Sequence, residues 1–188
     1  DPDKKVFVLQ NKLHQKYHSF YFNGGAGMGL SSNFQDTSLW HIDTGFYFSE
    51  EWAFEVNYNK YSNKDNDAYS NLKKLNGSVP FIRNPLESYS AMIKWEPFYG
   101  KINTFNKIIY FDWSFALGLG QLEMESNANT VSNSTTANTF NQEKYNTIAA
   151  KTNFQFHINK NMHVNLGIQM DNYKAPGPKI NNQPGQDK

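Results

Sequence analysis

Large apolar residues occupy every second position through most of this chain. One long stretch is Ile108–Gln121, where bulky apolar side chains from Ile109 to Leu119 alternate with polar or small ones. Because successive side chains of a strand point to opposite faces, the pattern predicts a β-strand with one apolar and one polar face. A strand of about ten residues with this division can cross a bilayer at a tilt, and it equally suits the wall of a soluble barrel.

Six further segments repeat this alternation, and helical periodicity is not convincing anywhere. They are Ser19–Leu30, Leu39–Phe48, Trp52–Tyr58, Ser88–Pro97, Thr147–Ile158 and Met162–Met170. Short connections alternate with long polar stretches at residues 62–87 and 122–142, which we interpret as loops. The order predicts an all-β fold, an antiparallel up-and-down transmembrane β-barrel of about eight strands.

The predicted boundaries divide the chain into three parts. Residues 1–18 form an N-terminal segment with room for one strand, residues 19–173 form the barrel, and residues 174–188 form a flexible, proline-containing tail. Seven strands are clear, so an eighth would have to come from Val6–Leu13 or from the tail. Residues 1–5 show no signal-peptide pattern, and in an exported protein we expect them to belong to the mature chain.

The residues on the two faces indicate which face points outward. The apolar face carries more large rings than the interior of an eight-stranded barrel accommodates. The residues assigned to a lipid-facing surface and its aromatic girdles are Phe22, Trp40, Phe48, Trp52, Phe54, Trp95, Phe111, Trp113 and Phe154. The residues assigned to a polar, closed lumen held by ion pairs are Asp43, Glu55, Lys94, Glu96, Asp112 and Lys151. This distribution favours a barrel of the bacterial outer membrane over a soluble barrel that binds a small apolar ligand.

The amino-acid composition of the chain excludes several classes of function. The 188 residues fit one domain, and a formal net charge of +1 gives no electrostatic reason to expect nucleic acid as a partner. The chain has no cysteine, which excludes thiolate metal sites and disulfides. No apolar run is long enough for a transmembrane helix. The mean hydropathy of −0.72 leaves a membrane barrel open, because barrel strands are apolar only at alternate positions.

Three segments resemble a known family. They are V-L-Q-N-K-L (Val8–Leu13), F-Y-F-S-E-E-W-A-F-E (Phe46–Glu55) and W-E-P-F-Y-G-K-I-N-T-F-N-K-I-I-Y-F-D (Trp95–Asp112). With the strand layout, about residues 6 to 173 resemble the outer-membrane β-barrel domain family of myxobacteria and Bdellovibrio-type predatory bacteria. The resemblance implies a small barrel of roughly eight strands, and some members assemble into rings around a lipid-filled cavity. The chain departs from the family in its last residues, because Gly177–Lys188 contains no aromatic-rich closing strand.

Candidate chemistry is weak throughout the sequence, and we predict no catalytic residue, metal or cofactor. His157 and His163 flank a turn, but a metal site needs three or four converging ligands. Ser38 and His41 have no motif that supports acyl chemistry. Glycines between Gly24 and Gly29 lie within a strand pattern, without the following helix that a phosphate-binding loop requires.

The small residues of that strand suggest a contact between copies of the chain. Gly24, Ala26 and Met28 form the candidate subunit contact, with local barrel curvature as the alternative explanation. The hypothesis is a non-enzymatic barrel with a structural or lipid-organising role, with membrane lipid as partner, assembled as a homo-oligomeric ring. The alternative is a monomeric membrane anchor whose loops at 62–87 and 122–142 bind a partner or surface. The sequence leaves open the subunit number, the lipid and whether the barrel conducts solutes.

Overall fold

The computed structural model describes residues 12, 14–30, 34–76, 79–104, 106–132 and 139–178. The elements, in chain order, are β1 (Phe20–Met28), β2 (Gln35–Tyr47), β3 (Trp52–Asp65), α1 (Asp67–Asn76), β4 (Arg83–Thr104), β5 (Lys107–Ser126), α2 (Ala128–Ser132), β6 (Asn141–His157) and β7 (His163–Asn172). The strands form one antiparallel sheet in which each pairs with its neighbours in sequence, in the order β1 to β7. This confirms the all-β, up-and-down architecture.

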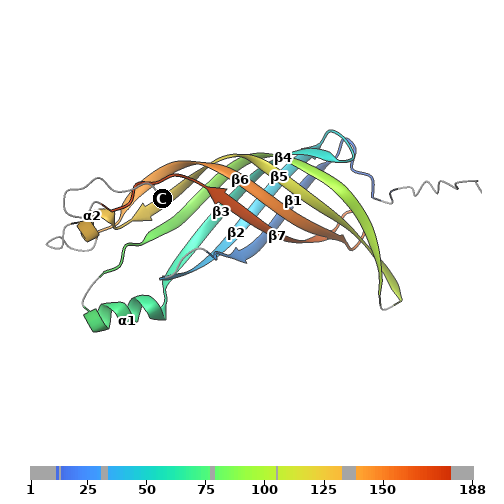
Figure 1. Cartoon of the computed structure of the whole chain (residues 1–188). Coiled ribbons are helices and arrows are strands. Elements are labelled where there is room, and N and C mark those ends of the chain that lie inside the picture. Colours follow the sequence, from blue (N-terminus) through green and yellow to red (C-terminus); the bar gives the residue numbers. More distant parts are fainter. Residues whose placement is uncertain are drawn as a thin grey trace, which may run out of the picture.

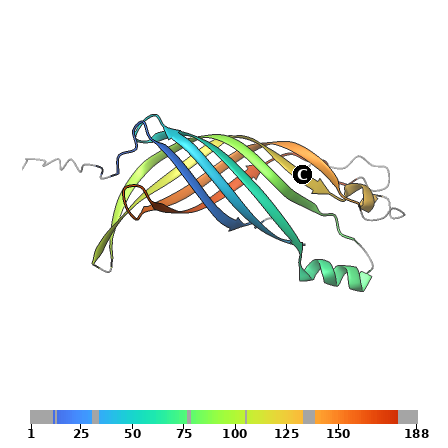
Figure 2. The ribbon, with the colours of Figure 1, turned by 180° about the vertical axis from the view of Figure 1, so that it is seen from behind.

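The sheet curls into an open barrel with two different ends (Figures 1 and 2). Tight connections join β2 to β3, β4 to β5 and β6 to β7, and we call this the short-turn end. Asn106 has φ 57° in the β4–β5 turn, a conformation that asparagine adopts more readily than most residues. The connections that contain α1 and α2 lie at the opposite, long-loop end.

The prediction of eight strands and a closed wall differs from the described structure. The sheet has seven strands, and no ladder joins β1 to β7 among the described residues. A side-chain contact between Asn23 of β1 and His163 of β7 bridges these edges, with 2.5 Å between Oδ1 and Nε2. We call this junction the seam. Most of Val6–Leu13, the predicted source of an eighth strand, lies outside the described residues, as does the tail beyond residue 178.

The strands also extend further than the alternating pattern predicts. β3 continues to Asp65 and β5 to Ser126, while helices α1 and α2 occupy parts of the ranges 62–87 and 122–142 that were predicted as loops. The alternating pattern also predicted that a strand ends at Pro97. In the structure β4 passes through Pro97 because a register shift between Trp95 and Phe98 leaves that residue out of the ladder.

Burial is inverted relative to a water-soluble barrel. Buried residues are mostly polar or charged, whereas the fully buried apolar core is small and centred on Met92, Ala116 and Ala149. Large apolar side chains line the outside of every strand, and many are more than two-fifths exposed, such as Phe22 at 69% and Leu117 at 62%. Soluble monomers rarely leave an apolar surface of this extent uncovered. Within the described residues, neither helix has the length and apolar character needed to span a membrane.

Candidate functional site: the charged interior

The candidate site is the polar interior, which is built from inward-facing residues at alternate positions of the strands. Four of its charged side chains are carboxylates, from Asp43 of β2, Glu55 of β3, Glu96 of β4 and Asp112 of β5, and each is at most 2% exposed. Charges this deeply buried are costly unless they are paired and hydrogen-bonded. The structure provides cations for all four carboxylates, in two clusters.

The first cluster is centred on Lys151 of β6. Its ammonium lies 2.7 Å from Asp43 Oδ2 and 2.9 Å from Glu55 Oε1, so one lysine neutralises part of two carboxylates. The hydroxyl of Tyr21 donates to Glu55 at 2.5 Å, and the side-chain amide of Asn57 donates to Asp43. This cluster ties strands β1, β2, β3 and β6 together across the interior.

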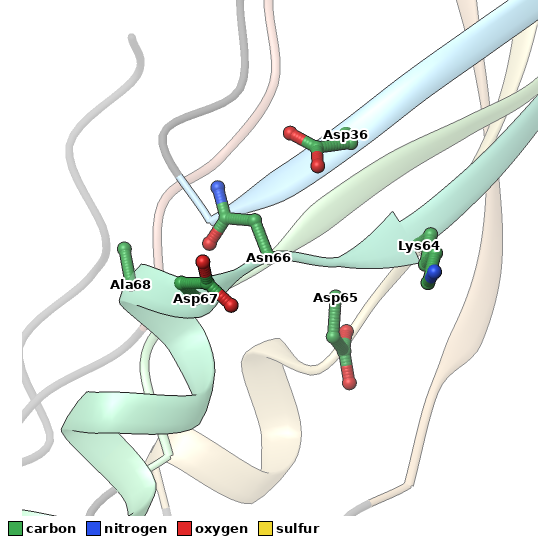
Figure 3. Close-up of a pocket in the computed structure, with 6 residues that line it drawn as sticks. All are labelled: Asp36, Lys64, Asp65, Asn66, Asp67 and Ala68. Atoms are coloured by element: carbon green, nitrogen blue, oxygen red, sulfur yellow. The ribbon is translucent and has the colours of Figure 1, made fainter.

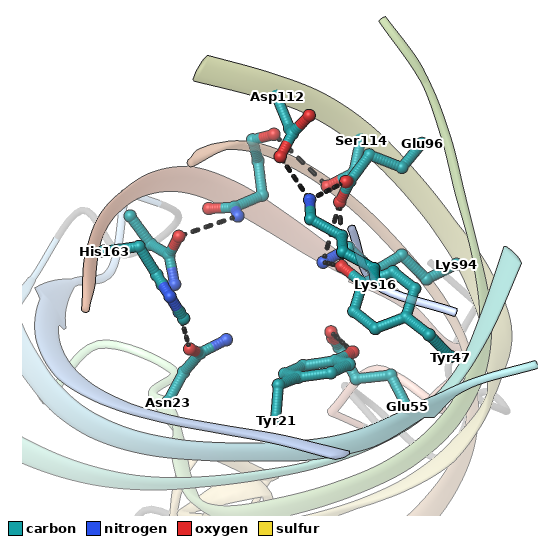
Figure 4. Close-up of polar contacts among 12 residues, drawn as sticks. Lys16, Tyr21, Asn23, Tyr47, Glu55, Lys94, Glu96, Asp112, Ser114 and His163 are labelled. Carbon is teal, nitrogen blue, oxygen red and sulfur yellow. Dashed lines mark hydrogen bonds and ion pairs between the residues drawn. The ribbon is translucent and has the colours of Figure 1, made fainter. Parts of the chain in front are cut away.

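The second cluster lies closer to the short-turn end and is centred on Lys16 (Figure 4). The Lys16 ammonium contacts both Glu96 and Asp112. Lys94 lies 3.2 Å from Glu96 and donates to the Tyr47 hydroxyl at 2.9 Å, and that hydroxyl donates in turn to Glu96. Each carboxylate of this cluster therefore has a lysine within ion-pair distance.

Lys16 belongs to the N-terminal segment, and the described residues of that segment, 12 and 14–18, lie at the short-turn end of the barrel. Glu50, in the β2–β3 turn, holds this segment by accepting hydrogen bonds from the backbone N–H groups of Lys16 and Tyr17 at 3.1 and 2.9 Å. The ring of His14 stacks on His157, with centroids 4.2 Å apart. Burial, together with the neighbouring His157, lowers the pKa of His14. Lys16 and His14 thus occupy the interior at the short-turn end.

The alternating pattern placed the six interior residues on one face, and the structure brings them together. The pattern did not identify Lys16. The six carry four negative and two positive charges, since Lys94 and Lys151 face Asp43, Glu55, Glu96 and Asp112. A buried set with that imbalance requires a further cation. The imbalance was the available signal, but alternation of side chains along strands cannot show which residue outside the strands supplies the charge.

Uncharged polar side chains occupy the adjoining interior, towards the long-loop end. Asn59 donates to Ser88 at 2.9 Å and to Asn57 at 2.7 Å, and all three are at most 5% exposed. Ser114 is also buried and donates to the backbone carbonyl of Asn153 at 3.2 Å. These contacts join residues of the same strand or of neighbouring strands, whereas the ion pairs of Lys151 and Lys16 cross the interior.

The residues predicted to face lipid lie on the outside. Seven of them are exposed: Phe22, Trp40, Phe48, Trp52, Phe54, Trp95 and Phe154. Phe111 and Trp113 are half-buried among neighbouring rings on the same face, and Trp113 stacks on Phe154 at 5.0 Å. Gly24, Ala26 and Met28, the predicted subunit contact, lie on the edge strand β1 and are exposed.

Aromatic rings gather towards both ends of this outer surface. Trp52 and Trp95 stack with centroids 5.9 Å apart near the short-turn end. Trp40, Tyr58 and Tyr89 form a second group towards the long-loop end, with centroid separations of 5.4 and 4.8 Å between neighbours. Aromatic groups of this kind bracket the apolar surface of membrane barrels, because their amphipathic rings favour the membrane–water interface. We call the apolar surface between the two groups the belt.

The structure shows no convergence of catalytic groups at the positions considered in the sequence. Ser38 lies exposed on the outside of β2, while His41 faces the interior with its Nδ1 3.4 Å from Asp43, so the two side chains point to opposite faces. His157 and His163 are paired across their hairpin, but their ring centroids are 6.4 Å apart and His157 bonds to Asp112.

An open depression lies among the described residues at the long-loop end. It is lined by Asp36, Lys64, Asp65, Asn66, Asp67 and Ala68 (Figure 3). Across the part of the chain that the structure describes, no group of three His, Asp or Glu side chains is placed to hold a metal ion. The depression therefore gives no basis for a metal site.

No family model, no curated protein and no solved structure matches the chain. The resemblance to the outer-membrane barrel family therefore stays a prediction from the sequence. The function is therefore inferred from the burial, the charges and the exposed surface of the fold.

Proposed function

We propose that the chain is a transmembrane β-barrel of the bacterial outer membrane with a structural or lipid-organising role. One observation carries the proposal, namely the inverted burial of the sheet. Paired charges fill the interior, and exposed apolar side chains with aromatic groups at both ends form the exterior. In water, the exposed belt would be an aggregation hazard, whereas in a bilayer it contacts lipid and the buried polar groups are satisfied inside.

The filled interior supports a non-enzymatic function without a large pore. Lys151 and Lys16 hold carboxylates of different strands across the interior, and the N-terminal segment occupies the short-turn end. A wide conduction path would require these ion pairs to separate, at the cost of leaving buried charges unpaired. Planar-bilayer recordings that show large, steady conductance for each chain would contradict this proposal.

We further propose that the protein acts as a homo-oligomeric ring that encloses lipid. The seam supports self-association, because β1 and β7 each pair with only one neighbour and leave a row of backbone groups without a ladder partner. The exposed positions Gly24, Ala26 and Met28 lie beside that seam on β1. The small side chains of Gly24 and Ala26 permit close approach by a second copy.

The mass of the detergent-solubilised protein tests this assembly. We expect light scattering, corrected for bound detergent, to give a discrete multiple of the 21.7 kDa chain, with phospholipid co-purifying. Ala26→Trp should lower that mass while the strand content measured by circular dichroism stays unchanged, because the added ring blocks close approach at β1. A single-chain mass for the unmodified protein would contradict the ring.

The alternative function is a monomeric membrane anchor whose long-loop end binds a partner. It is favoured by the two helical connections at that end and by Leu75 of α1, which is 82% exposed. A partner whose binding is lost on replacing residues 67–76 with a flexible linker, while the barrel still assembles, would favour the anchor.

A further inference from the structure

The β4–β5 hairpin continues beyond the strands that flank it at the short-turn end. β3 pairs with β4 only as far as Trp95, yet β4 runs on to Thr104, and β6 pairs with β5 only as far as Tyr110. In Figures 1 and 2 the tip of this hairpin lies apart from the other short turns. We call residues 98–104 and 107–111 the arm. It is a two-stranded ribbon with no described strand alongside its tip.

The outer face of the arm is apolar and continues the apolar outer face of the sheet. Phe98 stacks on Trp113 with centroids 5.4 Å apart, and Phe98 and Ile102 are 51% and 45% exposed. The ring of Phe111 lies over Gly100, where a Cβ would come within 2.5 Å of it. Glycine at this position therefore lets the aromatic ring lie flat across the ribbon, which keeps the face smooth and apolar.

The charge on the arm is positive without exception. Lys101 and Lys107 are exposed, and the sequence contains no acidic residue between Glu96 and Asp112. Tyr99 and Tyr110 stack beside Lys101 with centroids 5.8 Å apart. Exposed lysines with aromatic and aliphatic side chains are the composition of segments that lie in the headgroup region of anionic membranes.

The N-terminal segment covers the opposite face of the arm at its base. Lys12 lies 5.5 Å from the Tyr99 ring centroid, and the ring of His14 packs edge-on against Tyr110. Among the described residues these contacts lie at the base of the arm, whereas Lys101, further along the same face, and the apolar outer face are exposed. A lipid surface suits the arm better than a second copy of the chain does. The predicted subunit contact of a second copy lies in Phe20–Met28, which contains no carboxylate to pair with Lys101 and Lys107.

We propose that the arm docks in the headgroup region of an anionic phospholipid bilayer. Phe98 and Ile102 enter the boundary with the acyl chains, while Lys101 and Lys107 bind the negative surface. The proposal rests on the proposed membrane function, and it adds a second attachment that depends on lipid charge. The belt requires only apolar chains, whereas the arm distinguishes anionic from zwitterionic lipid.

Site-directed spin labels can test this proposal directly, because the chain has no cysteine of its own. Three single-cysteine variants carry the label, namely Ile102→Cys on the arm, Leu166→Cys on the belt and Lys160→Cys on the neighbouring β6–β7 turn. Each is reconstituted into phosphatidylcholine vesicles with and without phosphatidylglycerol. Oxygen relaxes labels in lipid, and a water-soluble nickel complex relaxes labels in water.

We expect the arm label to be relaxed by oxygen, like the belt label, in vesicles that contain phosphatidylglycerol. The Lys160 label should be relaxed by nickel. Replacing Lys101 and Lys107 with glutamine should shift the docked-to-free ratio of the arm by roughly 30-fold in those vesicles, since each lysine near an anionic surface contributes about 1 kcal/mol. In phosphatidylcholine alone, the same replacement should leave the label unchanged.

Three outcomes would overturn the proposal, and they differ from one another. If the arm label behaves like the Lys160 label while the belt label is in lipid, the arm does not dock and the proposed function stands. If the belt label is also in water, the proposed function itself fails. If the arm labels broaden one another, and dilution with unlabelled protein removes the broadening, the arm binds a second copy instead of lipid.

Discussion

Lys16→Met should destabilise the protein strongly. The Lys16 side chain is 7% exposed and contacts two carboxylates, Glu96 and Asp112, which are fully buried. Removing one partner of a buried ion pair typically costs about 3–5 kcal/mol, because the remaining charge stays buried without compensation. We expect about 3 kcal/mol, since Lys94 still pairs with Glu96 and His157 still bonds to Asp112. Urea unfolding of the vesicle-reconstituted protein measures the loss.

The neighbouring Lys12 provides a matched control on the same segment. Its ammonium lies 3.8 Å from Glu50 and 4.0 Å from Asp112, and its side chain is 21% exposed. Partly exposed pairs at such distances contribute about 1 kcal/mol or less, so Lys12→Met should have a small effect. Adding Asp112→Asn to the Lys16→Met variant should recover part of the lost stability, because it removes one of the uncompensated charges. Equal, small losses for both lysines would show that the N-terminal segment does not hold the barrel together.

Leu117→Arg should be the most damaging change on the outer surface. Leu117 lies within the belt, between Ile93 of β4 and Ala150 of β6 in the sheet, and is 62% exposed. In water, a charge at so exposed a position has little effect, typically within ±0.5 kcal/mol. At the centre of a bilayer, arginine on the lipid face of a barrel costs about 2–4 kcal/mol. We expect a loss in that range when the variant is unfolded from vesicles with urea.

Leu75→Arg is the matched control for the belt substitution. Leu75 lies on α1 at the long-loop end and is even more exposed than Leu117. Because the helix lies outside the belt, this change should alter the free energy of unfolding by no more than about 0.5 kcal/mol. Similar losses for the two variants would mean that the belt is in the same environment as the helix, which the membrane proposal does not allow.

The sequence predicted the parts of this structure that depend on local periodicity. Alternation between Ile109 and Leu119 identified a strand because a strand exposes its two faces to different surroundings, and inward placement of Asp112 followed from the same rule. Apolar and polar residues alternate less clearly where both faces of a strand have similar surroundings. Strand ends such as Asp65 and Ser126 were therefore missed, and the ladder that continues past Pro97 depends on a bulge that no local signal specifies.

The position of the N-terminal segment could not be predicted in the same way. Lys16 lies in a stretch without alternation, and its contacts with Glu96 and Asp112 join residues far apart in the chain. Only the charge imbalance among the predicted interior residues indicated that another cation was needed. The open seam has a similar origin, since pairing between β1 and β7 depends on how far the whole sheet curls.

Tryptophan fluorescence of the unmodified protein in vesicles tests the central claim most directly. The chain has four tryptophans, and Trp40, Trp52, Trp95 and Trp113 all lie on the outer face of the sheet. If this face contacts lipid, phospholipids brominated on their acyl chains will quench the emission strongly, and acrylamide in the water will quench it weakly. Emission that acrylamide quenches and brominated lipid leaves unchanged would place the outer face of the sheet in water and contradict the membrane-spanning barrel.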